Sequence, residues 1–384
     1  MILIAIRMIM GDRLKFAGLL VGITFAAMLI TQQASIFMGY SRRMTSFIDD
    51  TPHADIFVMD PDVEFTEDPK AMRETILQRV RSVPGVSWAV PMYRGQLLVQ
   101  IPSGKRAFSV VIGVDDSTLL GAPIEMIEGD VNALREGDGV VVDLAATKGD
   151  FAVTLPDGSK RPLQVGDQLA INDRFARVVG ICKTNEAFYW APVLYTTYSR
   201  AVSFAPEQRK QLTFVLAGVD DKSKIDEVAA DIHAATDMAA RTRKDFSSLT
   251  RNYTLIKTGI LVNFGITVGL GFIIGLLVCG QTFFNFVVDN TRYFGALKAL
   301  GLTNLRLIAM IITQSLVVGS LGFGLGAGLA SISGTLMTKV GVGFYMPWQL
   351  LVASCVSVML ICVVSACLPM IRVLRLEPAV VFKS

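Results

Sequence analysis

Four long segments without a charged residue dominate this sequence of 384 residues. Their charged borders are Lys15–Arg42, Lys257–Asp289, Arg306–Lys339 and Lys339–Arg372, and between these borders lie 26, 31, 32 and 32 mostly apolar residues. A helix of roughly 20 apolar residues crosses the hydrocarbon core of a bilayer. The pattern therefore predicts four transmembrane helices, one before a long polar block and three after it.

The charge of the chain is divided unevenly between the polar block and the rest. Residues 39–251 carry 25 Lys/Arg and 30 Asp/Glu, a net charge of −5, whereas the remainder carries 11 and 3, a net charge of +8. Lys and Arg concentrate in the short cytoplasmic loops of membrane proteins. The basic clusters before the first, after the second and after the fourth segment therefore place both termini in the cytoplasm and the block in the periplasm. The acidic block argues against nucleic acid as a partner.

The predicted fold class is an α+β membrane protein with four transmembrane helices, arranged 1+3, and a large extracytoplasmic α/β domain that carries a β-rich insert. The first apolar run exceeds the 7–15 residues of a signal peptide, so we expect an uncleaved span. The expected segments are 1–14 as a cytoplasmic interfacial helix, 15–41 as transmembrane helix 1, 42–250 as the periplasmic domain, 251–288 as a stalk and transmembrane helix 2, 289–304 as a cytoplasmic coupling helix, 305–338 and 348–371 as transmembrane helices 3 and 4, and 372–384 as a cytoplasmic tail. The alternative for residues 1–13 is that they are the start of the first span.

The order of strands and helices in the periplasmic block predicts a split α/β sandwich interrupted by the insert. A porter-like part in two pieces, 42–124 and 206–245, surrounds the β-rich insert 125–205. The expected elements are strands at 54–60, 86–90, 96–101, 107–114 and 212–219, helices at 68–83 and 222–235, and, in the insert, strands at 139–143, 151–155, 168–171 and 176–181. Pro156-Asp157-Gly158-Ser159 predicts a hairpin turn, because Asp-Gly supplies the required dihedral angles.

Residues 243–257 are polar, favour a helix, and contain no Gly or Pro before the second span. We therefore expect one helix to continue from the outer block through the membrane. At about 1.5 Å per residue, 45 residues would reach nearly 70 Å, a stiff lever from the outside to the inside.

No catalytic, metal or cofactor-binding constellation is present in the sequence. The two histidines, His53 and His233, are isolated, Cys182 is the only cysteine of the outer block, and no P-loop occurs. We therefore expect that this chain does not itself bind and hydrolyse ATP. No charged residue lies deep inside a predicted span, which disfavours an ion-coupled transporter or a channel.

Three groups of residues are candidate interaction sites. A short amphipathic helix at 289–301 would present a partner-binding surface on the inner side, with a plain solvated turn as the alternative. Gly322/Gly326 and Gly324/Gly328 are small-xxx-small pairs for helix packing. The run Phe188, Tyr189 and Trp190 is a candidate contact for an adaptor or a substrate, with core or edge packing as the alternative.

The run TRYFGALKALGLTNLRL at 291–307 resembles the E-G-x-LKALG-A loop of the FtsX/MacB-type permeases of ABC transporters. The resemblance continues in the Gly-rich third span and in the closing RVLRLEPAVVFKS. The runs ADIFVMDP at 54–61 and VSWAVPMY at 86–93 resemble a DevC-like branch, and GDGVVVDLAATKG and ARVVGI resemble the outer domain of MacB. One departure is that Tyr293 or Phe294 stands where the family has an acidic residue before the loop glycine.

The resemblance implies a non-catalytic homodimeric permease, driven by a cytoplasmic ABC ATPase, in a bacterial inner membrane. Such a permease transmits ATP-driven motion to its outer domains and exports a lipid-like, peptide or drug-like substrate, with a periplasmic membrane-fusion adaptor and an outer-membrane channel as further partners. The loop residues implied to contact the ATPase are Arg292, Tyr293, Phe294, Gly295, Ala296, Lys298, Ala299, Leu300 and Gly301. The alternatives are an FtsX-like transducer that controls a periplasmic cell-wall hydrolase, and a LolC/LolE-like lipoprotein-release subunit.

Overall fold

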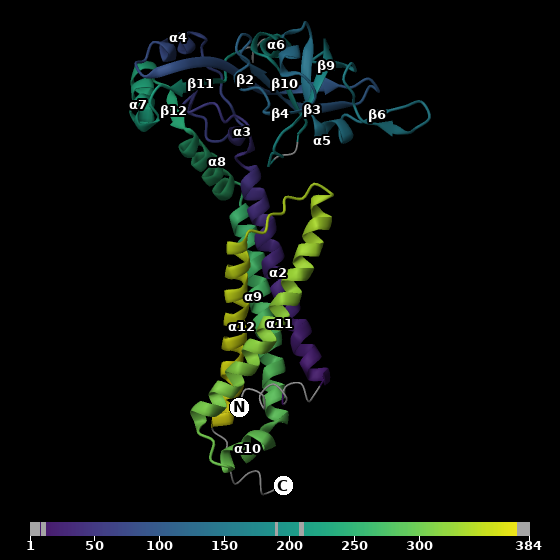
Figure 1. Cartoon of the computed structure of the whole chain (residues 1–384), viewed down its shortest axis with the longest axis vertical. Helices are drawn as coiled ribbons and strands as arrows, with labels where there is room; N and C mark the ends of the chain where they lie inside the picture. The colour runs from purple at the N-terminus through teal and green to yellow at the C-terminus, as the bar shows by residue number, and fades with distance from the viewer. Residues whose placement is uncertain (1–7, 9–12, 189–190, 207–210, 375–384) are drawn as a thin grey trace. The chain divides into compact units, whose positions relative to one another are not determined.

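The computed structural model describes Met8 and residues 13–188, 191–206 and 211–374 (Figure 1). The chain forms two compact units, one made of residues up to Tyr40 and from Gly259 onward, and one made of Ser41–Thr258. Of the expected interfacial helix of residues 1–14 only Met8, Arg13 and Leu14 are described, and most of the tail 372–384 lies outside the described residues.

The first unit contains four helices that are long and apolar enough to cross a membrane. They are α2 (Arg13–Arg43), α9 (Ile260–Asp289), α11 (Asn304–Thr338) and α12 (Trp348–Leu374). A short helix, α10 (Thr291–Ala299), joins α9 to α11. The described chain thus has the fold class expected from the sequence, with one candidate span before the polar block and three after it.

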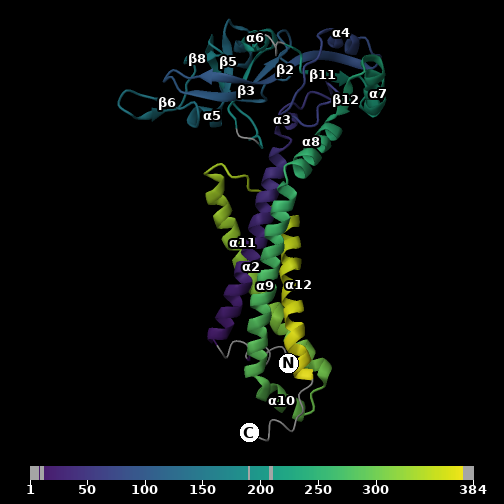
Figure 2. The same cartoon turned by 180° about the vertical axis from the view of Figure 1, so that it is seen from behind.

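The four helices lie side by side in the first unit (Figure 2), and one apolar core lies between them. It includes Ile23 of α2, Phe283 of α9, Val318 of α11 and Ile361 of α12, each with at most 1% of its surface exposed. In the segment between α11 and α12, the Tyr345 amide donates to the Ser35 carbonyl over 3.0 Å. The uncharged link is therefore tied to α2.

The second unit is built on a ten-stranded sheet in the order β12-β1-β11-β2-β3-β10-β5-β9-β4, with β8 paired to β2 and β9. Its strands are β1 (Ile56–Met59), β2 (Val86–Gln100), β3 (Arg106–Val114), β4 (Glu125–Gly129), β5 (Gly139–Asp143), β8 (Gln168–Ile171), β9 (Arg174–Lys183), β10 (Val193–Thr197), β11 (Phe214–Val219) and β12 (Ala239–Thr242). The separate hairpin is β6 (Val153–Thr154) with β7 (Lys160–Arg161).

Strand β2 connects the two parts of this sheet. Its first half pairs with β11 and its second half with β3, without a break between them. The expected separate strands at 86–90 and 96–101 are therefore one strand, and that prediction is wrong. Pairing with two successive partners keeps the backbone extended through Pro91 and Gly95.

Two helices cover one face of the sheet around β1, β11 and β2. They are α4 (Thr75–Arg81) and α7 (Ile225–Thr236), and they pack on a core that includes Ile56, Val58 and Val215. The helix expected at 68–83 is shorter than predicted, because the Met72 amide donates instead to the Leu212 carbonyl over 2.7 Å. The edge strand β12 was not anticipated.

The β-rich insert contains β4 to β10 with two short helices, α5 (Leu144–Lys148) and α6 (Tyr198–Phe204). The turn at Pro156–Ser159 confirms the predicted hairpin. Gly158 has a φ of +82°, and the Leu155 amide donates to the Ser159 carbonyl over 2.9 Å. The Asp157 carboxylate accepts from the Ser159 amide over 2.9 Å, which closes the turn.

The helix that approaches the second span is interrupted, so the continuous lever expected for residues 243–288 is wrong. Helix α8 (Arg243–Lys257) ends at Thr258, Gly259 has a φ of +68°, and α9 begins at Ile260. The Thr258 hydroxyl donates to the Thr254 carbonyl within the last turn of α8. A left-handed residue stops a helix, and glycine adopts this conformation without a steric cost. The boundary between the two units lies at this break.

Candidate functional site

Helix α10 gives the predicted coupling segment 289–304 a defined shape. The helix ends in a Schellman motif, in which the Gly301 amide donates to Lys298 O over 3.1 Å and the Leu302 amide donates to Leu297 O over 3.1 Å. Gly301 has a φ of +91°, which explains the glycine at this position. The connection from α9 to α11 is therefore a structured element and not a plain turn.

The two faces of α10 differ in exposure. Phe294 and Gly295 are buried, and Phe294 belongs to the core of the membrane unit. Lys298 is half-buried, and its Nζ donates to the Leu374 carbonyl over 2.9 Å. The other predicted contact residues are exposed, namely Arg292, Tyr293, Ala296, Ala299, Leu300 and Gly301.

An exposed aromatic and an exposed aliphatic side chain mark the outward surface of α10. Tyr293 is 65% exposed and Leu300 is 80% exposed. Two large apolar side chains of this segment are therefore exposed, whereas Phe294 of the same helix lies in the core.

An ion pair joins the beginning of α2 to the end of α9 near this helix. The Lys15 Nζ lies 2.6 Å from an Asp289 carboxylate oxygen. Both charges lie at the borders of uncharged segments, where a surface ion pair contributes only about 0–1 kcal/mol.

The glycines of α11 fall on two faces. A Cβ atom at Gly322 would lie 2.5 Å from Ile23 Cγ2, and one at Gly326 would lie 2.6 Å from both Ala27 Cβ and the Thr24 carbonyl oxygen. These two positions therefore allow α2 to approach closely. Gly324 and Gly328 have no atom within 4 Å of the corresponding position.

In the outer unit, the segments that adjoin the first and second spans in the chain meet in a cluster of Phe47, Phe214 and Phe246, which we call the root. Helix α3 (Ser46–Asp49) follows α2 in the chain, and α8 precedes α9. Phe47 of α3 lies 5.6 Å from Phe214 between ring centroids, and Phe246 of α8 lies 6.0 Å from Phe214. The Arg243 guanidinium donates to the Ile48 carbonyl over 3.1 Å. The root thus fixes α3 and α8 to the same strand, β11.

A buried arginine reinforces the root. Arg94 is 5% exposed, and its guanidinium donates to the Thr66 carbonyl over 2.6 Å and to Glu67 over 2.7 Å. The guanidinium carbon also lies 5.0 Å from the centre of the Phe47 ring. Breaking a buried ion pair by removing one partner is strongly destabilising, so Arg94 is expected to hold the root in one arrangement.

A set of polar contacts connects the root to the insert. The Asn185 side-chain amide donates to Asp50 over 2.6 Å, and within the insert the neighbouring Thr184 amide donates to Asp143 over 3.0 Å. Arg43 and Glu186 form an ion pair in the same segment. Burial raises the pKa of Asp50 to about 6. The chain after β9 is therefore held directly to the residues that follow α2.

The aromatic run is only partly described. Phe188 is half-buried, whereas Tyr189 and Trp190 lie outside the described residues. Among the described residues, no group of three or more His, Cys, Asp or Glu side chains is placed to hold a metal ion. Cys182 is buried and burial raises the pKa of its thiol.

Sequence comparison gives two family matches that together span most of the chain. The MacB-like periplasmic core domain matches residues 16–235, and the FtsX-like permease C-terminal domain matches residues 265–378. The chain belongs to the FtsX/MacB family of ABC transporter permeases. Members of this family are generally non-catalytic transporter subunits.

Three solved structures are similar to parts of this chain. The extracellular domain of the noncanonic ABC-type transporter YknZ from Gram-positive bacteria shares 13% identity, with a TM-score of 0.36 over 49% of this chain and 98% of that one. The periplasmic region of MacB from Actinobacillus actinomycetemcomitans shares 12% identity, with a TM-score of 0.37 over 54% and 98%. A domain of a putative permease from Porphyromonas gingivalis shares 14% identity, with a TM-score of 0.29 over 50% and 89%. No curated protein sequence matches the permease.

The residues of the root were missed by sequence reasoning. Phe47 and Phe246 lie far apart in the sequence and belong to short polar helices, so neither stands out from its neighbours. Arg94 carried a usable signal, because it is a charged residue within a strand whose neighbouring positions 89–93 are all buried. A charge at such a position is expected to be paired.

Proposed function

We propose that this permease couples ATP hydrolysis by a separate ATPase to movement of its outer unit, and thereby exports a lipid-like, peptide or drug-like substrate. The observation that carries this proposal is the two-faced helix α10. Its exposed surface, with Tyr293 and Leu300, is free to contact a partner, while the buried Phe294 belongs to the core of the four spans. ATP and Mg²⁺ would be held by the ATPase.

The root is the second support for this proposal. It fixes α3 and α8 against β11, and these helices continue along the chain into the first and second spans. A change in the arrangement of α2 and α9 would therefore be transmitted to the sheet through α3 and α8. The break at Gly259 makes the second connection a joint.

The surface of α9 supports a dimer of two copies. This helix exposes apolar residues together with the polar residues Gln281 and Asn285. A polar side chain that faces lipid loses its hydrogen bonds, whereas contact with a second helix restores them. We therefore include a second copy of the permease, packed along α9, in the proposed assembly. Gly324 and Gly328 of α11 provide a further surface for close approach.

The remaining parts of the proposal concern location and further partners. We propose an inner-membrane permease with both termini in the cytoplasm, because the basic clusters fall outside the acidic block. A periplasmic membrane-fusion adaptor and an outer-membrane channel would receive the substrate. Phe188, Tyr189 and Trp190 stay proposed as an adaptor or substrate contact.

The contact surface of α10 can be tested with one substitution. Leu300→Asp should abolish copurification of the ATPase and reduce substrate-stimulated ATP hydrolysis at least tenfold, because a charge replaces the most exposed apolar side chain of the loop. Val340→Asp is the matched control, since Val340 is 78% exposed and lies after α11, outside the coupling loop. Unchanged copurification in Leu300→Asp would show that the ATPase binds elsewhere.

A further inference from the structure

A hollow beside the end of β9 has the features of a small-molecule site. Its volume is about 230 Å³, and all of its lining residues belong to the outer unit. They come from the segment after α3, the start of β4, the end of β9 and the middle of β10. Sites for drug-sized ligands are larger, about 300–1,000 Å³, so this hollow suits a small ligand.

A buried hydroxyl at this hollow has no hydrogen-bond partner. Tyr195 of β10 is only 2% exposed, and it lines the hollow. Within the part of the chain that the structure describes, no group lies at hydrogen-bond distance from the Tyr195 hydroxyl. Buried polar groups are nearly always hydrogen-bonded, because an unpaired one costs free energy. A molecule bound in the hollow would supply the missing partner.

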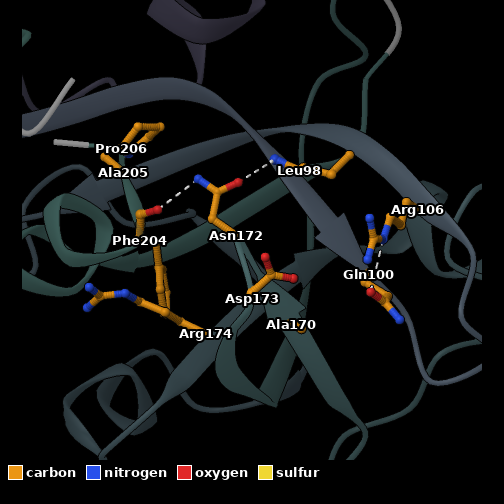
Figure 3. A pocket seen from close by; sticks show the side chains of 10 residues that line it. All are labelled: Leu98, Gln100, Arg106, Ala170, Asn172, Asp173, Arg174, Phe204, Ala205 and Pro206. Carbon is orange, nitrogen blue, oxygen red and sulfur yellow. Dashed lines mark hydrogen bonds between the residues drawn. The ribbon is translucent and has the colours of Figure 1, made fainter. Parts of the chain in front are cut away.

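A larger hollow at the β8–β9 turn differs in this respect. It has a volume of about 390 Å³, and Figure 3 shows Asn172 near its centre. The Asn172 side-chain amide donates to the Phe204 carbonyl over 2.8 Å, and its oxygen accepts from the Leu98 amide over 3.4 Å. Asn172 is therefore satisfied within the protein, whereas Tyr195 is not.

An apolar wall lies on the same face of the sheet as Tyr195. Tyr195, Cys182 and Met126 belong to one core, so their side chains share a face. Ile124 lies two residues before Met126, and alternate residues of a strand project from the same face. Ile124 is 62% exposed and lines the hollow, so it offers apolar surface to a ligand.

The lysine that lines the hollow is paired on the opposite face of the sheet. Lys183 is in register with Glu125, one position along from the pair Cys182 and Met126. The alternation of the strands therefore turns Lys183 and Glu125 away from the face of Tyr195. Their side chains form an ion pair at 3.3 Å, and together they add no net charge to the hollow.

Asp50 supplies the negative charge of the hollow. Burial, and to a lesser extent the carboxylates of Asp49 and Asp143, raise the pKa of Asp50 to about 6, against the hydrogen bonds from Asn185. At neutral pH this carboxylate is therefore mostly ionised. Among the described residues, no Lys or Arg forms an ion pair with it. A buried charge without a cationic partner favours the binding of a cation.

The charge of Asp50 also acts on Tyr195. Burial first, and then the negative charge of Asp50, raise the pKa of the Tyr195 hydroxyl well above its usual value. Arg94 opposes this effect, but its charge is balanced by its ion pair with Glu67 at 2.7 Å. The unpaired hydroxyl and the unpaired carboxylate are therefore close enough to interact, although they do not bond to each other.

We propose that this hollow binds a small primary amine, whose ammonium group donates to the Asp50 carboxylate and to the Tyr195 hydroxyl oxygen, and whose apolar part lies against Ile124. An ammonium group has three donors and no acceptor, so it can satisfy both oxygens at once. The site goes beyond the proposed export function and does not depend on it, because binding requires neither the ATPase nor nucleotide. A failure of the α10 experiment would leave it unaffected.

The test is fluorine NMR of para-fluorobenzylamine, added at neutral pH to the full chain in phosphatidylcholine nanodiscs. This lipid has no primary amine that would compete. The line broadening should be saturable, and para-fluorobenzyl alcohol, which has a similar size but no charge, should bind at least about tenfold more weakly. Equal binding of the two compounds, or no saturable binding of the amine, would overturn the proposal.

Two substitutions locate the binding site. Asp50→Asn should weaken binding of the amine at least about tenfold, because it removes the charge that the ammonium group pairs with. Tyr195→Phe should weaken it about threefold or more without lowering the thermal unfolding midpoint, because the hydroxyl has no partner within the described protein. Unchanged affinity in either variant would contradict the site.

The matched control is Glu125→Gln. Glu125 lines the same hollow but projects from the other face of the sheet, so this variant should bind the amine like the wild type. A loss equal to that of Asp50→Asn would reduce the effect to general surface charge and overturn the proposal.

Discussion

Single carboxylates decide how firmly the root is attached to the insert. Asp50 is the clearest case, because burial raises its pKa from 3.8 to about 6 while Asn185 donates to it. The folded protein therefore holds a proton on Asp50 more tightly than the unfolded chain does. The stability that this proton contributes is fully present below about pH 4 and is lost as the pH rises through about 6.

The pH dependence should be visible as a difference between two proteins. The thermal unfolding midpoint of the wild type should fall relative to that of Asp50→Asn as the pH rises from 4 to 7. The pKa of Asp167 is lowered by its hydrogen bonds from Arg161, so this carboxylate stabilises the folded protein more as the pH rises. Both proteins contain Asp167, so it does not alter the difference between their midpoints. Midpoints that change in parallel across this range would contradict the assignment to Asp50.

At the scale of elements, the break between α8 and α9 replaces the expected lever by a joint. Gly259 holds a left-handed conformation that costs an alanine about 1–2 kcal/mol. Gly259→Ala should therefore favour a continuous helix and reduce coupled export. Spin labels at positions 251 and 262 should then show a narrow distance distribution near 16 Å, the length of 11 helical residues at about 1.5 Å each.

The matched control for the joint is Gly265→Ala. Gly265 lies within α9, and no atom lies within 4 Å of the position of an added Cβ. The control should leave export unchanged and add at most about 1 kcal/mol of helix stability. A distance distribution unaffected by Gly259→Ala would show that the left-handed glycine does not govern the connection.

At the scale of the whole molecule, the root should separate partner binding from export. Phe246 is fully buried among aromatic rings, so Phe246→Ala should destabilise the outer unit by about 3–5 kcal/mol. We expect the ATPase to copurify with this variant, because α10 is unchanged, while export is lost. The measurements are copurification, export and the unfolding midpoint.

The control for the root lies on the same helix. Ile256 of α8 is 71% exposed, so Ile256→Ala should change neither stability nor export. Full export by Phe246→Ala, despite its lower stability, would show that the root is a structural core alone and does not transmit movement.

The spans, the split outer domain and the coupling loop could be predicted because each depends on local or short-period information. Runs without charge, the alternation of strands, the Asp-Gly turn and the LKALG-type loop are properties of neighbouring residues. The resemblance implied both Phe294 and Leu300 as ATPase contacts, but only the folded structure shows that Phe294 is buried while Leu300 is exposed. Gly322 and Gly326 were expected to pack, but their separation from Gly324 and Gly328 required the position of α2.

The parts of the fold that the sequence did not predict depend on the folded structure, mostly on contacts between residues far apart in the chain. Strand β2 continues through Pro91 because β11 and β3 bond to it in succession, and α8 stops because Gly259 adopts a left-handed conformation next to an apolar span. The root and the Asp50–Asn185 contact join residues more than one hundred positions apart. Membrane partitioning depends on local composition, so the amino-acid order was enough to predict the spans, whereas contacts between distant residues exist only after the chain has folded.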